Sequence, residues 1–336
     1  MKLTRTIGFL LALTAAMGFA ISAHAAREAD PKAKDLILKG DAKCTGCHDE
    51  ADEPAPTMLA LHPGVLRIGK TKHGTRADGR TPSCTNCHGE SLDHLNYKGK
   101  DKPPKPDRVF TMHGQSSADV RNEACTSCHE KDAKRSHWAG STHQLRDVAC
   151  TDCHQMHTSN DRVRNKRTQS EVCFTCHKEQ RAQVNRPSHH PIPEGKMGCS
   201  DCHNAHGSSG PKLMVRDSVN ATCYTCHMEK RGPFVHNHEP VSEDCGNCHN
   251  PHGTTAENML KVRAPFLCHQ CHTPHGGFIP QLRGAQVTGN LPANNSGYAK
   301  GTINVTQARA CLNCHTQVHG SNNPSATNPT PQFNLR

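Results

Sequence analysis

Ten copies of the motif Cys-x-x-Cys-His take up all 20 cysteines of this chain. The motif is the attachment sequence for c-type haem: its two thiols bond to the edge of the haem, and the following histidine, the proximal ligand, binds the iron. The cysteines are Cys44, Cys47, Cys84, Cys87, Cys125, Cys128, Cys150, Cys153, Cys173, Cys176, Cys199, Cys202, Cys223, Cys226, Cys245, Cys248, Cys268, Cys271, Cys311 and Cys314. The proximal histidines are His48, His88, His129, His154, His177, His203, His227, His249, His272 and His315. Since no cysteine is left over, the sequence predicts ten covalently bound c-type haems.

Zinc binding and disulfide bonding are the two alternatives to this interpretation. Zinc sites also use Cys-x-x-Cys pairs, but they need two pairs, or one pair and two histidines, and no histidine directly after each second cysteine. Cysteines separated by two residues form a redox-active pair at best, rather than ten structural bridges. The repeated histidine therefore favours haem.

A second axial ligand decides whether each iron can bind a substrate, because a filled site can only exchange electrons. Of the 27 histidines, one lies in the first 25 residues and ten are proximal, which leaves 16 for ten irons. Five of these follow a proximal histidine by three or four residues, namely His157, His206, His252, His275 and His319. Each is too close to its neighbour to reach the opposite face of the same haem. We expect it to bind the iron of the next haem, although a solvent-facing or propionate-pairing role is the alternative.

The elements that position these motifs are expected to be short. Only 33% of the residues are apolar, 4% are aromatic and the mean hydropathy is −0.74, so the side chains alone make a poor core. The 26 glycines and 22 prolines disfavour long helices. We expect a multihaem cytochrome c fold: short α-helices and irregular loops wrapped round a chain of ten haems that serve as the core, with almost no β-structure.

Four segments are expected along the chain. Residues 1–25 are typical of a cleaved signal peptide, because Lys2 and Arg5 precede an apolar run that ends in a small-x-small cleavage site, and the run is too short for a membrane anchor. A loop near residue 187 divides the motifs five and five, so residues 26–186 and 187–320 are expected to form two pentahaem halves. Residues 321–336 are polar and predicted to be a flexible tail.

The net charge of +10 does not indicate nucleic-acid binding. Each haem carries two propionates, and lysine and arginine side chains are suited to pair with them. A signal peptide also directs the chain to the periplasm, away from nucleic acid.

Several longer segments resemble the MtrA-type decahaem cytochromes, a family that includes the PioA and MtoA proteins. The resemblance extends from Cys44 to Ser321 and rests on the segments CHQMH, CSDCHNAHG, SVNATCYTCHMEKRGP, CHNPHG, LKVRAPFLCHQCH and CLNCHTQVHGSN. It implies that every iron has two histidine ligands and that the protein is no enzyme but an electron conductor. It also implies a place inside an outer-membrane β-barrel.

The resemblance assigns the second, distal ligand by matching local motifs. The distal histidines implied are His73, His94, His143, His157, His190, His206, His238, His252, His275 and His319. Three of these assignments have rivals: His189 for His190, His236 for His238, and His62 or His113 for His73. The histidines implied to be non-ligands are His62, His113, His137, His189, His236 and His269.

The function implied is electron transfer across the outer membrane, between periplasmic redox partners and extracellular iron, in the direction of Fe(II) oxidation or of metal reduction. Polar loops cannot lie in lipid, so the expected partner is an outer-membrane β-barrel porin of the MtrB, MtoB or PioB kind. Periplasmic or inner-membrane cytochromes are the other expected partners, and an extracellular multihaem cytochrome is a further candidate. The alternatives are a soluble periplasmic electron carrier that serves a terminal reductase, and a multihaem reductase, which would need an open iron.

The haem count gives the first testable prediction. The intact mass of the purified mature protein should exceed that of the bare chain by ten haems, because all ten motifs bond covalently to their haem. A mass that matches the bare chain would contradict the haem interpretation altogether.

Overall fold

The structure is a computed structural model, and it describes residues 30–48, 64–75, 80–111, 115–272, 311–313 and 315–322. The expected signal peptide, almost all of the expected tail, Cys314, His275 and the rival ligands His62 and His113 lie outside the described residues.

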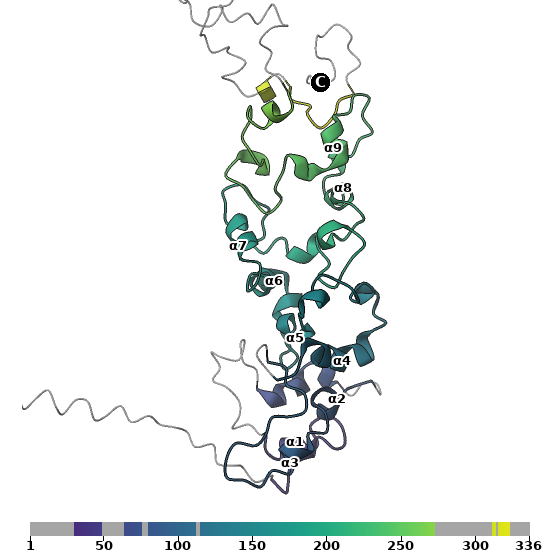
Figure 1. Ribbon diagram of the computed structural model, residues 1–336, viewed down its shortest axis with the longest axis vertical. Helices are drawn as coiled ribbons and strands as arrows, with labels where there is room; N and C mark the ends of the chain where they lie inside the picture. The colour runs from purple at the N-terminus through teal and green to yellow at the C-terminus, as the bar shows by residue number, and fades with distance from the viewer. Residues whose placement is uncertain are drawn as a thin grey trace, which may run out of the picture. The chain divides into compact units, whose positions relative to one another are not determined.

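The described chain consists of short helices joined by irregular segments (Figure 1). The α-helices are α1 (Ala42–Thr45), α2 (Cys84–His88), α3 (Leu92–Leu95), α4 (Ala118–His129), α5 (Cys150–Cys153), α6 (Lys166–Cys173), α7 (Lys178–Val184), α8 (Val219–Cys223) and α9 (Glu239–Glu243). The 3-10 helices are η2 (Val65–Lys70), η3 (Lys72–Gly74), η4 (Ala133–Arg135), η5 (Gln144–Arg146), η6 (Arg162–Arg164), η7 (Cys199–Asp201), η8 (Pro211–Leu213), η9 (Met228–Lys230), η10 (Cys245–Asn247), η11 (Glu257–Met259), η12 (Cys268–Gln270) and η15 (Cys311–Asn313).

Extended structure in the described residues is limited to four isolated bridges, and no strand forms there. The bridges pair Ser188 with Thr254, His203 with Met214, His236 with Ser321, and His249 with Leu260. The expected fold of short helices and loops with almost no β-structure is therefore confirmed.

The chain divides into two compact units. Unit 1 contains residues 1–116 and 156–159, and unit 2 contains residues 117–155 and 160–336. Within unit 2 the helices from α4 to α9 follow one another in chain order (Figure 1). The boundary expected near residue 187 lies inside unit 2, and the division into two pentahaem halves stays a prediction.

Polar N-caps begin three helices of unit 2. The side chains of Ser117, Asn165 and Ser218 accept hydrogen bonds from the first-turn amides of α4, α6 and α8. These caps satisfy amides that have no partner within the helix. Each of the three helices runs into the first cysteine of a haem motif, so the caps fix where that motif begins.

Buried amide side chains join each of these helices to the next motif. In α4, Asn122 accepts a hydrogen bond from the Cys150 amide at 2.7 Å and donates one to the Val148 carbonyl. In α8, Asn220 accepts from the Cys245 amide at 2.7 Å. Arg121 of α4 adds an ion pair with Asp152 of α5 at 2.8 Å, in which both side chains are largely buried. Polar groups at these depths need such partners, so the contacts fix consecutive motifs against each other.

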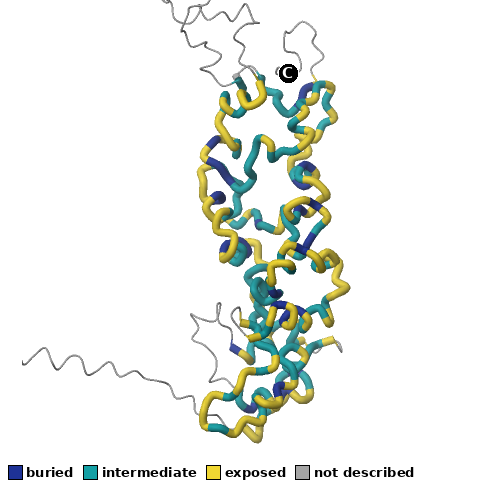
Figure 2. The backbone as a smooth tube through the Cα atoms, viewed as in Figure 1, coloured by how far each residue is buried: buried dark blue, intermediate teal, exposed yellow. Residues whose placement is uncertain are grey.

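Apolar burial is sparse in the described residues. The buried apolar side chains are Ile37, Ala118, Ala149, Phe174, Val184, Met214 and Ala256, and the buried polar ones outnumber them. Figure 2 shows the buried residues as short stretches between exposed and half-buried ones. In addition, no helix within the described ranges is long and apolar enough to span a bilayer. The free energy gained from burying so few apolar side chains cannot offset the conformational entropy that the chain loses on folding. We therefore expect the haems to supply most of the core.

Haem-free protein should therefore fail to fold. We expect circular dichroism of the mature chain, produced without haem attachment, to show little helix and no cooperative thermal transition. The holoprotein is the control, and a cooperative transition in the haem-free chain would show that the side chains suffice.

Candidate haem-binding sites

Each haem motif is built as one tight turn. In eight motifs the amide of the proximal histidine donates to the carbonyl of the first cysteine, at 2.8–3.0 Å, and the other two motifs lie within α2 and α4. Helical spacing places residues i, i+3 and i+4 on one side of the turn. The two thiols and the imidazole of a motif therefore face the same space, as covalent haem attachment requires.

Within the described ranges, histidine rings from separate segments lie opposite each other in the following eight pairs. The pairs are His48–His94, His88–His157, His154–His206, His177–His143, His203–His252, His227–His190, His249–His319 and His272–His238, with ring centroids 6.0–6.3 Å apart. Each pair joins one predicted proximal histidine to one predicted distal histidine.

The ring separation fits a metal between the two imidazoles. An imidazole nitrogen lies about 2 Å from a first-row metal that it binds, and the ring centroid lies about 1 Å further back. Two rings on opposite faces of one iron therefore have centroids about 6 Å apart. The pairs include every predicted proximal histidine except His129 and His315, and every predicted distal one except His73 and His275.

Backbone carbonyls orient the paired rings. Nδ1 donates to a carbonyl oxygen at 2.6–3.1 Å in His88, His94, His143, His157, His190, His203, His238 and His249. Because a carbonyl can only accept, Nδ1 carries the hydrogen and Nε2 keeps a lone pair for a metal. Ring orientation by a second contact is a general property of metal-binding histidines.

Burial keeps several of these rings neutral. It lowers the pKa of His88, His206, His252 and His319, and neighbouring histidines lower it further. Neutral imidazole is the form that binds iron, so the buried positions favour ligation.

The structure distinguishes the candidates at two positions that the sequence leaves open. His190 faces His227, whereas its neighbour His189 donates to the Arg186 carbonyl through Nδ1 and contacts Glu194 through Nε2 at 3.3 Å. His238 faces His272, whereas the backbone of His236 pairs with Ser321. In both places the residue taken as distal ligand is the one that faces a proximal ring.

The histidines that follow a motif face a ring further back in the chain than that of the adjacent motif. His157, His206, His252 and His319 face the proximal ring of the motif two places before their own, not that of an adjacent motif. This differs from the expectation that they bind the next haem along.

A glycine directly after three of these histidines explains the longer reach. Gly207, Gly253 and Gly320 have φ values of 104°, 136° and 131°. A Cβ on Gly207 would lie 2.0 Å from the carbonyl oxygen of His137, and one on Gly253 would lie 2.3 Å from that of Gln183. Only glycine allows both the positive φ and the close approach to the earlier segment. The recurring His-Gly pair was the signal in the sequence for this connection.

Consecutive motifs meet through their first cysteines. The side chains of these cysteines are neighbours in the pairs Cys44–Cys84, Cys125–Cys150, Cys173–Cys199, Cys223–Cys245 and Cys268–Cys311. Since each thiol is the point of attachment of a haem edge, the haems of these motif pairs attach side by side.

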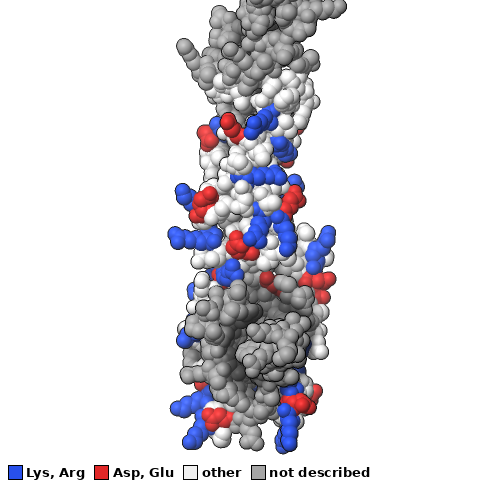
Figure 3. Space-filling view, turned by 90° about the vertical axis from the view of Figure 1, so that its left-hand side faces the viewer, with Lys and Arg blue, Asp and Glu red and all other residues white. Residues whose placement is uncertain are grey.

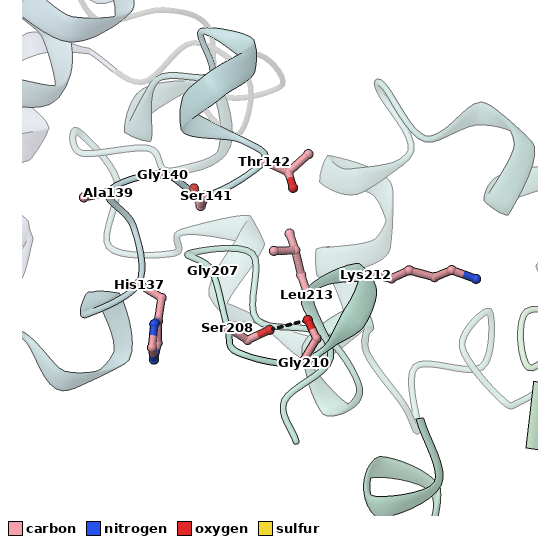
Figure 4. Close-up of a pocket in the computed structure, with 10 residues that line it drawn as sticks. All are labelled: His137, Ala139, Gly140, Ser141, Thr142, Gly207, Ser208, Gly210, Lys212 and Leu213. Atoms are coloured by element: carbon pink, nitrogen blue, oxygen red, sulfur yellow. Dashed lines mark hydrogen bonds between the residues drawn. The ribbon is translucent and has the colours of Figure 1, made fainter. Parts of the chain in front are cut away.

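A cavity of about 300 Å³ lies among the ligand-bearing segments of unit 2 (Figure 4). It is lined by residues from 137–142, just before His143, and from 207–213, just after His206. One lining residue, Lys212, provides the carbonyl that orients His203. The cavity therefore lies beside the segments that carry His143 and His206.

Comparison with known proteins agrees with this geometry. Residues 189–232 and 238–277 match the family described as doubled CXXCH motif, and residues 84–170 match the family described as cytochrome c-type protein NrfB-like. The chain is 41% identical over 293 residues to the multiheme cytochrome MtrA of Shewanella baltica (strain OS185). The aligned region covers 85% of this chain and 80% of the relative. The chain belongs to the MtrA family of multihaem cytochromes. As a member of the MtrA family it carries covalently bound c-type haems at its Cys-x-x-Cys-His motifs and transfers electrons.

Neighbouring histidines 189 and 190 provide a matched test of the ring pairs. In the ferric MtrA-family protein, His190→Ala should leave the iron held by His227 with one ligand and convert one haem to a high-spin form. His189→Ala should leave the spin state unchanged. Electron paramagnetic resonance measures both, and a high-spin signal from His189→Ala alone would reverse the assignment.

Proposed function

We propose that this chain carries ten haems, each held by two histidines, and conducts electrons through the outer membrane inside a β-barrel porin. The observation that carries the proposal is the set of eight ring pairs at one common separation of 6.0–6.3 Å. When bound, the haems supply a row of iron centres that accept and release single electrons.

The residues of the chain hold and enclose these centres. The two imidazoles of a pair would hold one iron between them, which would leave no coordination site for a substrate. The carbonyls that accept from Nδ1 fix eight of the paired rings, which would limit rearrangement when an electron moves. Neighbouring first cysteines would keep the haem edges of two consecutive motifs near each other in five motif pairs. These features support conduction rather than catalysis.

The charged surface of the chain is suited to the polar interior of a barrel. On the face shown in Figure 3, lysine and arginine side chains are interspersed with aspartate and glutamate. Irregular loops with such side chains cannot contact lipid, because their backbone groups would lose their hydrogen bonds. A wide outer-membrane barrel has a polar interior that accepts them. The signal-like residues 1–25 agree with assembly from the periplasmic side.

Redox partners at the two ends follow from this arrangement. We infer that periplasmic or inner-membrane cytochromes exchange electrons with one end, and that extracellular iron, directly or through an extracellular multihaem cytochrome, exchanges them at the other. The likeness to an MtrA protein supports this proposal. The direction of flow is set by the potentials of the donors and acceptors.

Membrane fractionation and affinity purification test the proposal. The tagged chain should co-purify with a β-barrel from the outer membrane, and deletion of the barrel gene should release it into the periplasmic fraction. In liposomes, an internal dye should be reduced by external dithionite only when chain and barrel are both present. A chain that stays periplasmic in cells with the barrel would instead be a periplasmic carrier.

The identity of further partners distinguishes the two physiological directions of electron flow. Co-purification of an extracellular multihaem cytochrome favours metal reduction, whereas a barrel alone favours Fe(II) oxidation.

A further inference from the structure

Three of the ring pairs form a comparable set in unit 2. The pairs His154–His206, His203–His252 and His249–His319 have nearly parallel rings, with interplanar angles of 11°, 16° and 14°. In each pair the proximal histidine donates its Nδ1 hydrogen to an acceptor seven to nine residues further along the chain. Ring orientation therefore cannot make the reduction potentials of the three irons differ.

The acceptor is where the three sites differ. His203 and His249 donate to the carbonyls of Lys212 and Asn258 at 2.9 and 2.8 Å. His154 instead donates to the carboxylate of Asp161, at 2.6 Å. One proximal ligand of the set is thus in direct contact with a full negative charge.

The carboxylate is well shielded from water. The side chain of Asp161 is 12% exposed, and its other oxygen accepts a hydrogen bond from the Gln155 amide at 3.3 Å. A charge at this depth is weakly screened. His129 also contacts a carboxylate, that of Asp132 at 3.0 Å, but both side chains are about half exposed and Arg135 pairs with the same aspartate.

Basic residues near the distal rings do not distinguish the sites. Arg135 lies in the electrostatic range of His206, Lys212 in that of His252 and Lys230 in that of His319. Each site of the set has one such neighbour, and two of the distal rings also have a glutamate in range, Glu179 for His252 and Glu229 for His319. What is particular to the His154 site is a carboxylate in hydrogen-bond contact with the proximal ring.

A hydrogen bond to a carboxylate makes an imidazole a stronger electron donor to its metal, and hydrogen bonding around the ligands is one of the means by which a protein sets a haem potential. We propose that Asp161 is a positioning residue that gives the iron of His154 and His206 a lower reduction potential than the irons of the two counterpart sites. The inference rests on the proposed two-histidine ligation. No bond to substrate is involved, since the iron only gains and loses one electron.

Asp161→Asn tests this directly, because the amide keeps the shape and an oxygen acceptor but removes the charge. In a potentiometric titration followed by haem absorbance, we expect one component, equivalent to one haem, to move to a higher potential while the remainder stays in place. Asp161→Glu, which keeps the charge, should leave that component closer to its original potential.

Asp107→Asn is the matched control. Asp107 opens the same Asp-Arg-Val sequence after another motif, but its carboxylate accepts from the Ser91 amide, while His88 donates to the Arg108 carbonyl. This variant should leave the titration unchanged. If Asp107→Asn shifts a potential as far as Asp161→Asn does, or if Asp161→Asn with full haem content shifts none, the proposal is overturned.

A measurement on the unaltered protein covers the case in which Asp161→Asn loses haem. Electron paramagnetic resonance at a series of poised potentials follows each low-spin signal until its haem is reduced. Among the three near-parallel sites, the signal lost at the lowest potential should have g values closer together than those of the other two, as a stronger donor produces. If the signal with the closest g values is lost before either of the other two, the role of Asp161 is overturned, whereas a high-spin signal would overturn the two-histidine ligation on which it rests.

Discussion

Opposed histidine rings are the interaction on which the rest of this structure depends. Each pair brings together segments far apart in the sequence, such as those of His88 and His157 in unit 1 or His203 and His252 in unit 2. A metal bound by both rings links these segments, and its binding free energy then becomes folding free energy. With so few buried apolar side chains in the described residues, such links take the place of an ordinary core.

Two kinds of contact alternate along unit 2. Buried amides such as Asn122 and Asn220 fix a helix to the motif that follows it, and first cysteines meet there. Histidine-glycine turns such as His206-Gly207 then return the chain to an earlier segment. Each contact involves near neighbours in the array, so unit 2 is organised like a repeat protein in which every element depends on the next one or two.

The sequence predicts the parts of this arrangement that are local. The motifs identify the proximal histidines, short helices follow from the glycine and proline content, and recurring text around His206 and His252 identifies candidate distal ligands. Which histidine faces which proximal ring depends on the path of the chain, so the pairing of His206 with His154 does not follow from the sequence. The role of Asp161 is hidden in the sequence for a similar reason: Asp161 matches Asp107 there, and only the contact with His154 distinguishes the two.

The position of each partner ring along the chain has a consequence for biosynthesis. His177, His227 and His272 face rings that precede them in the sequence, whereas His154, His203 and His249 face rings that are synthesised two motifs later. In a chain exported from its N-terminus, the first group can close its sites as soon as haem is attached. If two histidines hold each iron as proposed, the second group must wait for a later segment, and maturation then proceeds in alternating order. Loss of the C-terminal segment that carries His319 would then open the site of His249, far upstream of the break.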